Sequence, residues 1–264
     1  MQTSATCGLS VRELRTSAGK LWPERVVPAA TPFQAFSEAG MRYAFAADYV
    51  KGREVLDVAC GTGIGSSFLR LAGARSVTGV DVSGACISLA QELYPNCAFM
   101  KGDACALPFS AGSFDVAVSF ETIEHLSDAA SFLDSCLRVL RPGGLLVIST
   151  PNREVSRFTP NPYHIKEFRL GELVELVRSR FSKVDAFGQS PVNMFTFIPV
   201  RSAVRFLETL GLKNALRTLI RPRTSELVED LNFEVSKLEQ KSRVFPYTQS
   251  LFQRPTYHVL ICRK

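Results

Sequence analysis

An apolar run that contains an acid and leads into a glycine-rich turn constrains this chain more than any other feature. The run, residues 54–59, includes Asp57, and the turn at 60–65 carries three glycines. Glycine lets the backbone approach a ligand where a Cβ would collide, and N–H groups at the following helix start can face a carboxylate or phosphate. A second strand-like run, residues 76–80, ends at Asp81, whose carboxylate can accept both ribose hydroxyls. This unit predicts a site for an adenosine-containing ligand.

Strand-like and helix-like segments alternate after this unit. Such alternation implies a parallel sheet with helices on both faces. The ligand is then expected at the carboxyl ends of the strands, where the strand order reverses. Ser83 is a suitable N-cap for the second helix of the series. The predicted strands are 54–59, 76–81, 98–102, 114–120, 144–149, 183–188 and 256–262, and the predicted helices are 40–50, 64–72, 84–93, 128–140 and 169–181.

Composition excludes several classes of protein. The chain has 264 residues and is 46% apolar, which is enough for one substantial core. Seven dispersed cysteines without a Cys-x-x-Cys pair argue against a disulfide framework or a zinc knuckle and fit a reducing, cytoplasmic location. No apolar run reaches the roughly 18 residues of a membrane span, and the first 20 residues lack a secretory apolar region. The net charge of +6 is mild, so no stable nucleic-acid partner is expected.

The chain divides into three predicted regions. Residues 1–40 show little periodicity and are interpreted as an N-terminal arm and lid. The ligand-binding core spans 41–188 and is completed by 256–264. Residues 189–255 form an insertion between the last two strands, and a segment of this length is usually functional. We expect it to form a helical cap that covers the pocket and shapes the choice of substrate.

Two helical patterns, 199–220 and 224–242, lie within the insertion. The stretch 199–223 is basic and amphipathic, and such a helix can lie on an anionic membrane or bind a phosphorylated substrate. The favoured interpretation is a cap helix whose apolar side packs on the core and whose basic side meets water. Acidic residues in the second pattern can neutralise the basic side. Peripheral membrane contact is therefore not favoured.

A second cluster of reactive side chains follows the fourth predicted strand. Glu121, Glu124 and His125 stand at positions i, i+3 and i+4, which brings them to one side if the turn is helical. His164 follows the fifth strand, and the carboxyl ends of both strands meet at the same rim. Two of the three histidines in the chain therefore fall at one place.

Three roles suit this cluster. Two carboxylates and two imidazoles can hold a divalent cation such as Mg²⁺, Mn²⁺ or Zn²⁺, which lowers the pKa of a bound hydroxyl. Without a metal, His125 or His164 can act as general base, oriented by Glu121 or Glu124. In a structural role, the two carboxylates cap the following helix and His125 packs against the ligand.

Further motifs extend the likeness to a known family. Residues 102–104 (Gly-Asp-Ala) close the third predicted strand, and residues 140–144 (Leu-Arg-Pro-Gly-Gly) lead into the fifth. With the glycine turn, these ordered motifs make residues 42–188 resemble the class I S-adenosylmethionine (SAM) methyltransferases. The resemblance implies an α/β, Rossmann-like, seven-stranded sheet of order 3-2-1-4-5-7-6. In it the last strand runs antiparallel, with helices on both faces and the helical insertion before that strand.

The resemblance also implies SAM as the cofactor and assigns residues to each part of it. A guanidinium can pair with a carboxylate through two parallel hydrogen bonds, and a strand-end acid suits ribose hydroxyls. The implied residues are Asp57, Gly61 and Gly63 at the methionine end, Arg42 at its carboxylate, Asp81 at the ribose with Val82 beside it, Asp103 and Ala104 at the adenine, and Phe120 beside the sulfonium.

The cluster after the fourth strand has two local likenesses. Glu-x-x-Glu-His with a later His resembles the metal site of 2′-O-methyltransferases that act on the 3′ ends of small RNAs, and ubiquinone-pathway O-methyltransferases carry a similar motif. Over about residues 38–189 the chain resembles bacterial type 11/12 methyltransferases of glycan and natural-product biosynthesis. These often place a histidine before the Arg-Tyr pair, where this chain has Gly40-Met41. The resemblance implies O-methylation of a small molecule, on a sugar or phenolic hydroxyl.

Three other functions are weighed against this one. An RNA methyltransferase acting on a terminal ribose needs a basic, aromatic-lined track, for which the basic stretch 199–223 is a poor substitute. A SAM-fold protein that binds without catalysis is disfavoured by the intact acids Asp57, Asp81 and Asp103. A nicotinamide dehydrogenase is disfavoured by the motifs after the third strand and by the expected strand order.

Overall fold

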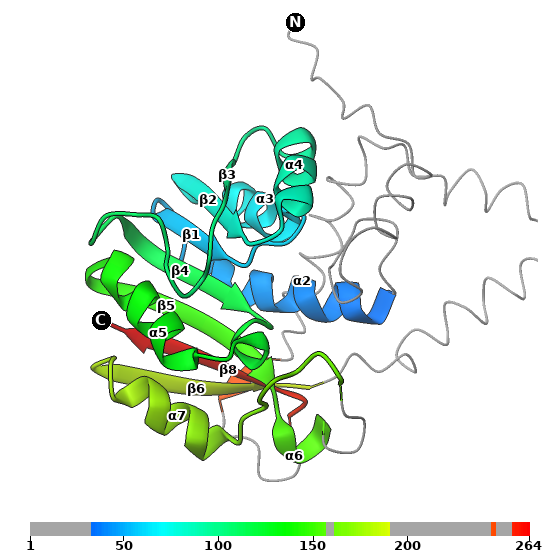
Figure 1. The fold of residues 1–264 in the computed structure, drawn as a ribbon, viewed down its shortest axis with the longest axis vertical. Coiled ribbons are helices and arrows are strands. Elements are labelled where there is room, and N and C mark those ends of the chain that lie inside the picture. Colours follow the sequence, from blue (N-terminus) through cyan, green and yellow to red (C-terminus); the bar gives the residue numbers. More distant parts are fainter. Residues whose placement is uncertain (1–32, 157–160, 191–243, 247–254) are drawn as a thin grey trace, which may run out of the picture.

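The computed structural model describes residues 33–156, 161–190, 244–246 and 255–264, which contain one mixed sheet of order β3-β2-β1-β4-β5-β8-β6-β7 (Figure 1). The strands are β1 (Glu54–Val58), β2 (Ser76–Asp81), β3 (Ala98–Lys101), β4 (Phe114–Phe120), β5 (Leu140–Pro151), β6 (Lys183–Gln189), β7 (Val244–Pro246) and β8 (Tyr257–Arg263). The helices are α2 (Phe33–Ala47), α3 (Ile64–Leu71), α4 (Gly84–Leu93), the 3-10 turn η1 (Ile123–His125), α5 (Ala129–Val139), α6 (Arg153–Ser156) and α7 (Leu170–Arg178).

The strand order confirms the predicted 3-2-1-4-5-7-6 arrangement, with β8 as the displaced last strand. β1 to β5 pair in parallel, whereas β8 runs antiparallel to both β5 and β6. The sheet has one strand more than predicted, because Val244–Pro246 pairs with the end of β6 at the edge. Three residues are too few for a period-two pattern to stand out, so this strand carries no recognisable sequence signal.

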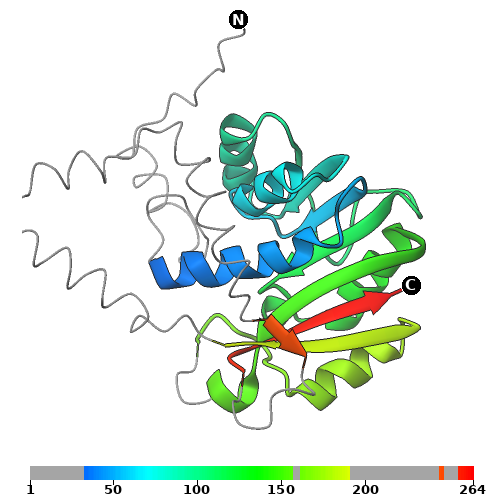
Figure 2. The ribbon, with the colours of Figure 1, turned by 180° about the vertical axis from the view of Figure 1, so that it is seen from behind.

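Alternate residues of the strands face two separate cores, as a sheet covered on both faces requires. On one face, Leu56, Leu146 and Leu260 pack with α5 and α7. On the other, Val55 and Val147 pack with α2 and α3. Figure 2 shows α2 and α3 in front of the sheet, whereas α5 and α7 lie in front of it in Figure 1. The carboxyl ends of the parallel strands therefore emerge between two layers of helices.

Helix α2 begins at Phe33, so the predicted boundary between arm and core at residue 40 lies inside it. Its buried residue Glu38 anchors it to the far end of the sheet. The Glu38 carbonyl accepts a hydrogen bond from the Gln189 amide at 3.0 Å, and its carboxylate accepts one from Tyr257 at 2.8 Å. The helices predicted at 199–220 and 224–242 lie outside the described residues.

Within the described ranges, no helix is both long and apolar enough to cross a membrane.

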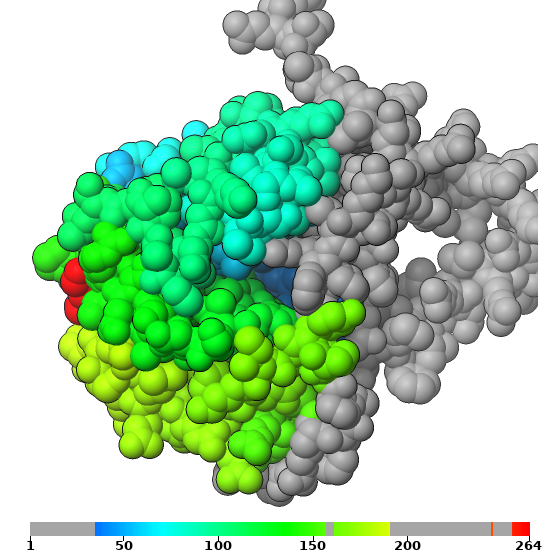
Figure 3. Space-filling view, in the orientation of Figure 1, coloured from blue at the N-terminus to red at the C-terminus, as the bar shows by residue number. Residues whose placement is uncertain are grey.

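The space-filling view shows a hollow between the segments around α4 and α5, with the blue residues of α2 at its floor (Figure 3). This hollow lies on the side toward which the parallel strands point in Figure 1. The residues predicted to bind the ligand follow those strand ends.

Candidate active site

The glycine turn joins β1 to α3 through left-handed backbone at Ala59, Gly61 and Gly63, whose φ angles are 59°, 56° and 82°. A Cβ on Gly63 would lie 2.7 Å from the Phe99 ring, and one on Gly65 would lie 1.9 Å from the Tyr43 ring. These two glycines therefore leave room for protein side chains as well as allowing the turn. Of the two glycines predicted to bind the ligand, Gly61 is the one whose backbone N–H is hydrogen-bonded to a predicted ligand-binding acid, Asp81.

Asp81 connects that turn to the end of β2. Its carboxylate accepts the Gly61 N–H at 2.9 Å and the Ser83 N–H at 2.8 Å, and the residue is buried. Asp81 thus has a structural task, holding two loops together, that the sequence did not reveal. The neighbouring Val82 side chain is 64% exposed, which leaves an apolar surface directly beside the acid.

Asp57 lies behind the turn and is fully buried. Its carboxylate accepts hydrogen bonds from the Ser66 hydroxyl at 2.6 Å and the Tyr43 hydroxyl at 3.2 Å. Burial raises the pKa of Asp57 to about 7, even though both hydroxyl donors lower it. Asp57 therefore holds α2 and α3 against β1 through hydroxyl groups, in an interior that disfavours its charged form.

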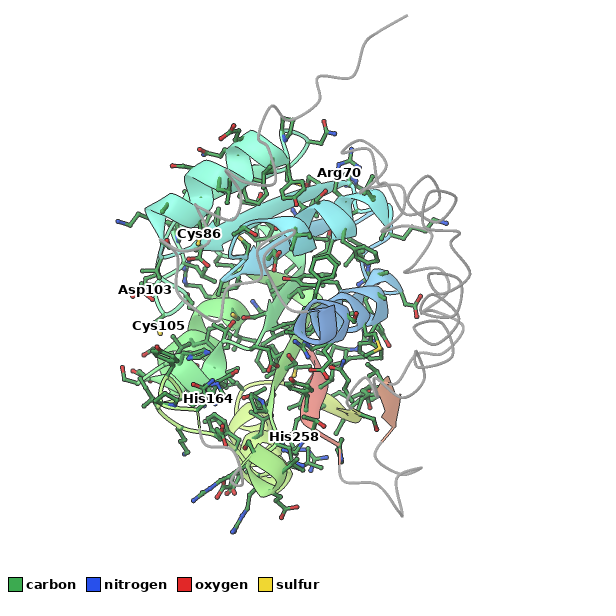
Figure 4. All side chains as sticks on the ribbon, turned by 90° about the vertical axis from the view of Figure 1, so that its right-hand side faces the viewer. Arg70, Cys86, Asp103, Cys105, His164 and His258 are labelled. Carbon is green, nitrogen blue, oxygen red and sulfur yellow. The ribbon has the colours of Figure 1, made fainter. Side chains whose placement is uncertain are left out.

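Asp103 and Ala104 follow β3, at the edge of the sheet where the other parallel strands also end. Asp103 is exposed, and its carboxylate accepts the Cys105 N–H at 2.8 Å. Phe120 ends β4 and packs edge-to-face on Tyr43, with ring centroids 5.0 Å apart. Figure 4 looks onto this side of the molecule, where Asp103, Cys105 and His164 lie along one edge of the view.

Arg42 lies on α2 and is buried, so it does not form a salt bridge at the protein surface. Its Nη1 donates to Gln189 at 2.9 Å, and the guanidinium lies 4.5 Å from the centroid of the Tyr257 ring. Its Nε is 4.0 Å from the Glu121 carboxylate and finds no hydrogen-bond partner among the described residues. A buried guanidinium with a spare donor fits a ligand carboxylate.

Glu121 departs from the predicted helical turn. Its φ is +51°, so the chain changes direction there and the i, i+3, i+4 argument does not apply to it. The Glu121 carboxylate accepts the Ser149 hydroxyl at 2.6 Å and faces Arg42. Glu121 thus lies between Arg42, which is predicted to bind the cofactor, and Glu124, which belongs to the second cluster.

Glu124 lies on η1 and is fully buried. One carboxylate oxygen accepts the Thr150 hydroxyl at 2.9 Å, and the other has no partner in the part of the chain that the structure describes. Burial, followed by the nearby Glu121, raises the pKa of Glu124 well above its usual range.

Backbone hydrogen bonds bring His164 to this turn. The N–H groups of Ile165 and Lys166 both donate to the Glu124 carbonyl, at 2.8 and 3.0 Å. The loop after β5 is thereby fixed on the loop after β4, and the His125 and His164 rings meet edge-to-face with centroids 4.9 Å apart. Potential metal-ligating atoms of Glu124, His125 and His164 all lie within 4.8 Å of one another. The structure thus brings together three of the four predicted cluster residues, without Glu121.

Both imidazoles have a partner on Nδ1. His125 Nδ1 lies 3.0 Å from the Tyr163 carbonyl, and His164 Nδ1 lies 2.6 Å from the Glu167 carboxylate. An oxygen acceptor requires that Nδ1 carries the proton, so in the neutral form of each imidazole Nε2 is the nitrogen with the lone pair. The Asn161 amide lies 3.0 Å from His164 Nε2, as a donor to that lone pair should.

Glu167 and Asn161 were not among the predicted site residues. Their positions, three residues on either side of His164, are the signal that could have identified Glu167 as a partner if the loop had been read as a turn.

Comparison with known proteins agrees with the fold and the glycine turn. A family model described as a methyltransferase domain matches residues 56–148. This part of the chain is a methyltransferase domain. SAM is therefore the cofactor of the domain, as the motifs implied, and the buried Arg42 with a spare donor fits its carboxylate.

The similarity to known proteins extends over only part of the length of each relative. A probable SAM-dependent methyltransferase of Mycolicibacterium smegmatis is 41% identical over 138 residues, 51% of this chain and 53% of that protein. A 2-methyl-6-phytyl-1,4-hydroquinone methyltransferase of Synechocystis is 35% identical over 142 residues, 53% of this chain and 45% of that protein. The chain thus matches about half the length of these curated relatives.

A solved structure supports the fold of the methyltransferase domain and extends beyond it. A SAM-dependent methyltransferase of Thermotoga maritima, described as a possible histamine N-methyltransferase, has a TM-score of 0.54. It is 18% identical and covers 85% of this chain and 89% of its own. At this identity the likeness concerns the fold alone.

Proposed function

We propose that this protein transfers the methyl group of SAM to a hydroxyl of a small-molecule acceptor, a sugar or a phenolic natural product. The observation that carries the proposal is the meeting of Glu124, His125 and His164 beside the strand end that bears Phe120. Groups that can activate a hydroxyl therefore stand next to the cofactor half of the site. The domain family and the hydroquinone methyltransferase among its relatives support a small acceptor.

On the cofactor side, the chain binds and orients. SAM supplies an electrophilic methyl group on a sulfonium, so the protein needs mainly alignment and exclusion of water. In this proposal Arg42 pairs with the SAM carboxylate, while Asp57, Gly61 and Gly63 shape the methionine end. Asp81 with Val82 and Asp103 with Ala104 receive the ribose and the adenine, and Phe120 flanks the sulfonium.

On the acceptor side, the chain removes a proton. The Nε2 lone pair of His125 or His164 can take the hydroxyl proton, and the Glu167 carboxylate, 2.6 Å from His164 Nδ1, can stabilise an imidazolium formed at His164. A divalent cation held by the same cluster would instead lower the pKa of the hydroxyl. Either route needs the two imidazoles in the geometry that the loop after β5 provides.

The test is S-adenosylhomocysteine release across a panel of sugars, nucleotide-sugars, catechols and short RNAs, with and without EDTA. Release with a sugar or catechol is expected. His164→Ala should cut turnover and leave cofactor affinity unchanged, with Glu175→Gln on the exposed side of α7 as the control. Cofactor binding with no release on any acceptor would instead indicate a SAM-fold binding protein.

A terminal-ribose RNA methyltransferase is the second candidate. The convergence of one carboxylate and two imidazoles also suits adjacent hydroxyls, which a terminal ribose offers. A short RNA and its 2′-deoxy counterpart distinguish the two functions. Release only with the 2′-hydroxyl RNA, and with no small molecule, would replace the proposal above.

A further inference from the structure

Arg42 carries a buried charge that is not fully paired among the described residues. Only 5% of its side chain is exposed, and its Nε donates no hydrogen bond there. The Glu121 carboxylate lies 4.0 Å from this Nε, which is beyond hydrogen-bond distance. A charge in the protein interior is costly unless it is paired, so this guanidinium calls for an anionic partner. In the proposed function that anion is the SAM carboxylate.

Gln189 holds one edge of the guanidinium in a fixed direction. The residue is fully buried at the end of β6, and its side-chain amide donates to the Glu38 carbonyl at 3.0 Å. Because a carbonyl can only accept, the NH₂ group must face Glu38, and the amide oxygen is left to face Arg42. That oxygen accepts a hydrogen bond from Arg42 Nη1 at 2.9 Å. A neutral amide therefore orients the guanidinium without neutralising its charge.

Tyr257 fixes the face of the same guanidinium. The centroid of its ring lies 4.5 Å from the guanidinium carbon, which is close enough for a cation–π contact. The Tyr257 hydroxyl donates to the Glu38 carboxylate at 2.8 Å, which ties the ring to α2. Gln189 and Tyr257 are paired with each other across β6 and β8, so the sheet sets the position of both side chains.

The Glu121 carboxylate is a competing partner for this charge. A guanidinium without these two contacts would close the gap to Glu121, because opposite charges attract strongly in the protein interior. Glu121 itself is held by the Ser149 hydroxyl at 2.6 Å. Resting on the proposed function, we propose that Gln189 and Tyr257 are positioning residues, which keep the Arg42 guanidinium available to the cofactor carboxylate.

The experiment compares two ligands that differ only in the group that Arg42 binds in this proposal. SAM and decarboxylated SAM are each titrated into the full chain by calorimetry, without acceptor. Wild type should prefer SAM, and Arg42→Ala should remove the preference. Gln189→Met keeps the side-chain volume and removes both amide hydrogen bonds. It should lower SAM affinity by roughly 10-fold and leave the affinity for decarboxylated SAM within about twofold.

Two variants at Tyr257 separate its ring from its hydroxyl. Tyr257→Leu removes the ring and should lower SAM affinity by roughly 3–10-fold, with the affinity for decarboxylated SAM unchanged. Tyr257→Phe keeps the ring over the guanidinium and should retain SAM affinity within about twofold of wild type. Glu175→Gln on α7 should bind both ligands like wild type.

The affinity for decarboxylated SAM also shows whether each variant keeps a folded site. Equal losses for the two ligands in Gln189→Met and Tyr257→Leu would mean that these residues act on the fold alone and would overturn the proposal. A SAM preference that survives both substitutions would overturn it as well. A preference that survives Arg42→Ala would remove Arg42 from the cofactor site, and the proposal with it. Because no acceptor is present, a failure of methyl transfer in the turnover assay would contradict the proposed function and leave these binding results standing.

Discussion

At the scale of single residues, Ala59 occupies backbone that favours glycine. Its φ of 59° lies in the left-handed region, which costs a residue with a Cβ roughly 1–2 kcal/mol. Ala59→Gly should therefore stabilise the fold by about 1 kcal/mol, measured by urea unfolding. Ala85→Gly, at an exposed position in α4, should instead destabilise it by about 1 kcal/mol. Equal losses in both variants would show that the turn stores no strain at Ala59.

Asp57 should make stability depend on pH. Its pKa in the folded protein is about 7, above the ordinary 3.8, so the folded state binds the proton more tightly. The stabilisation from this proton is complete below about pH 4 and is lost as the pH rises to about 7. Without cofactor, the difference in unfolding free energy between wild type and Asp57→Asn should fall by about 3 kcal/mol from pH 5 to pH 8. A difference independent of pH would mean that Asp57 is already ionised in the folded protein at pH 5.

At the scale of elements, the contact between α2 and α3 depends on the absence of one Cβ. A side chain on Gly65 would overlap the Tyr43 ring, which also donates to Asp57 and packs on Phe120. Gly65→Ala should destabilise the protein by roughly 1–3 kcal/mol. Gly171→Ala in α7 meets nothing within 4 Å, so it should stabilise by up to about 1 kcal/mol. Thermal unfolding of the two variants in parallel measures both effects.

The regular elements were predictable because their signals are local. The alternating pattern identified β2, α4 and β4 to the residue, and Ser83 caps α4 as expected by accepting the Cys86 N–H. The start of α2 was missed by seven residues, because its first two turns are anchored by distant parts of the sheet such as Gln189. Long-range contacts of this kind leave no periodic trace in the sequence.

The candidate site was predictable only in part. The carboxyl ends of β4 and β5 were expected to bring His125 and His164 to one rim, and their rings are in contact. The positive φ of Glu121 could not be foreseen, because glutamate rarely adopts it. The bonds that fix the two loops run between backbone atoms, from Ile165 and Lys166 to the Glu124 carbonyl, so no residue type announces them.

At the scale of the whole molecule, the chain leaves the sheet at the end of β6 and returns to it at the start of β7, beside the residue where it left. Gln189 pairs with Val244, so residues 190–243 can be replaced by an Asn-Gly hairpin turn. Cofactor affinity should stay within about twofold, because every residue assigned to the cofactor lies outside residues 190–243. The order of preferred acceptors should change, as measured by S-adenosylhomocysteine release. A folded variant that no longer binds SAM would mean that residues 190–243 belong to the cofactor site.

The place of β8 sets the timing of folding during synthesis. β5 and β6 flank β8 and have no direct pairing with each other, so both edges stay open until residues 257–263 arrive. At about 5–20 residues per second, a ribosome needs roughly 3–13 s to make residues 190–256. Throughout that interval the nascent chain exposes two unpaired strand edges, which attract other strands. The time before residues 257–263 are synthesised is thus the period in which a chaperone does most to keep this protein from aggregating.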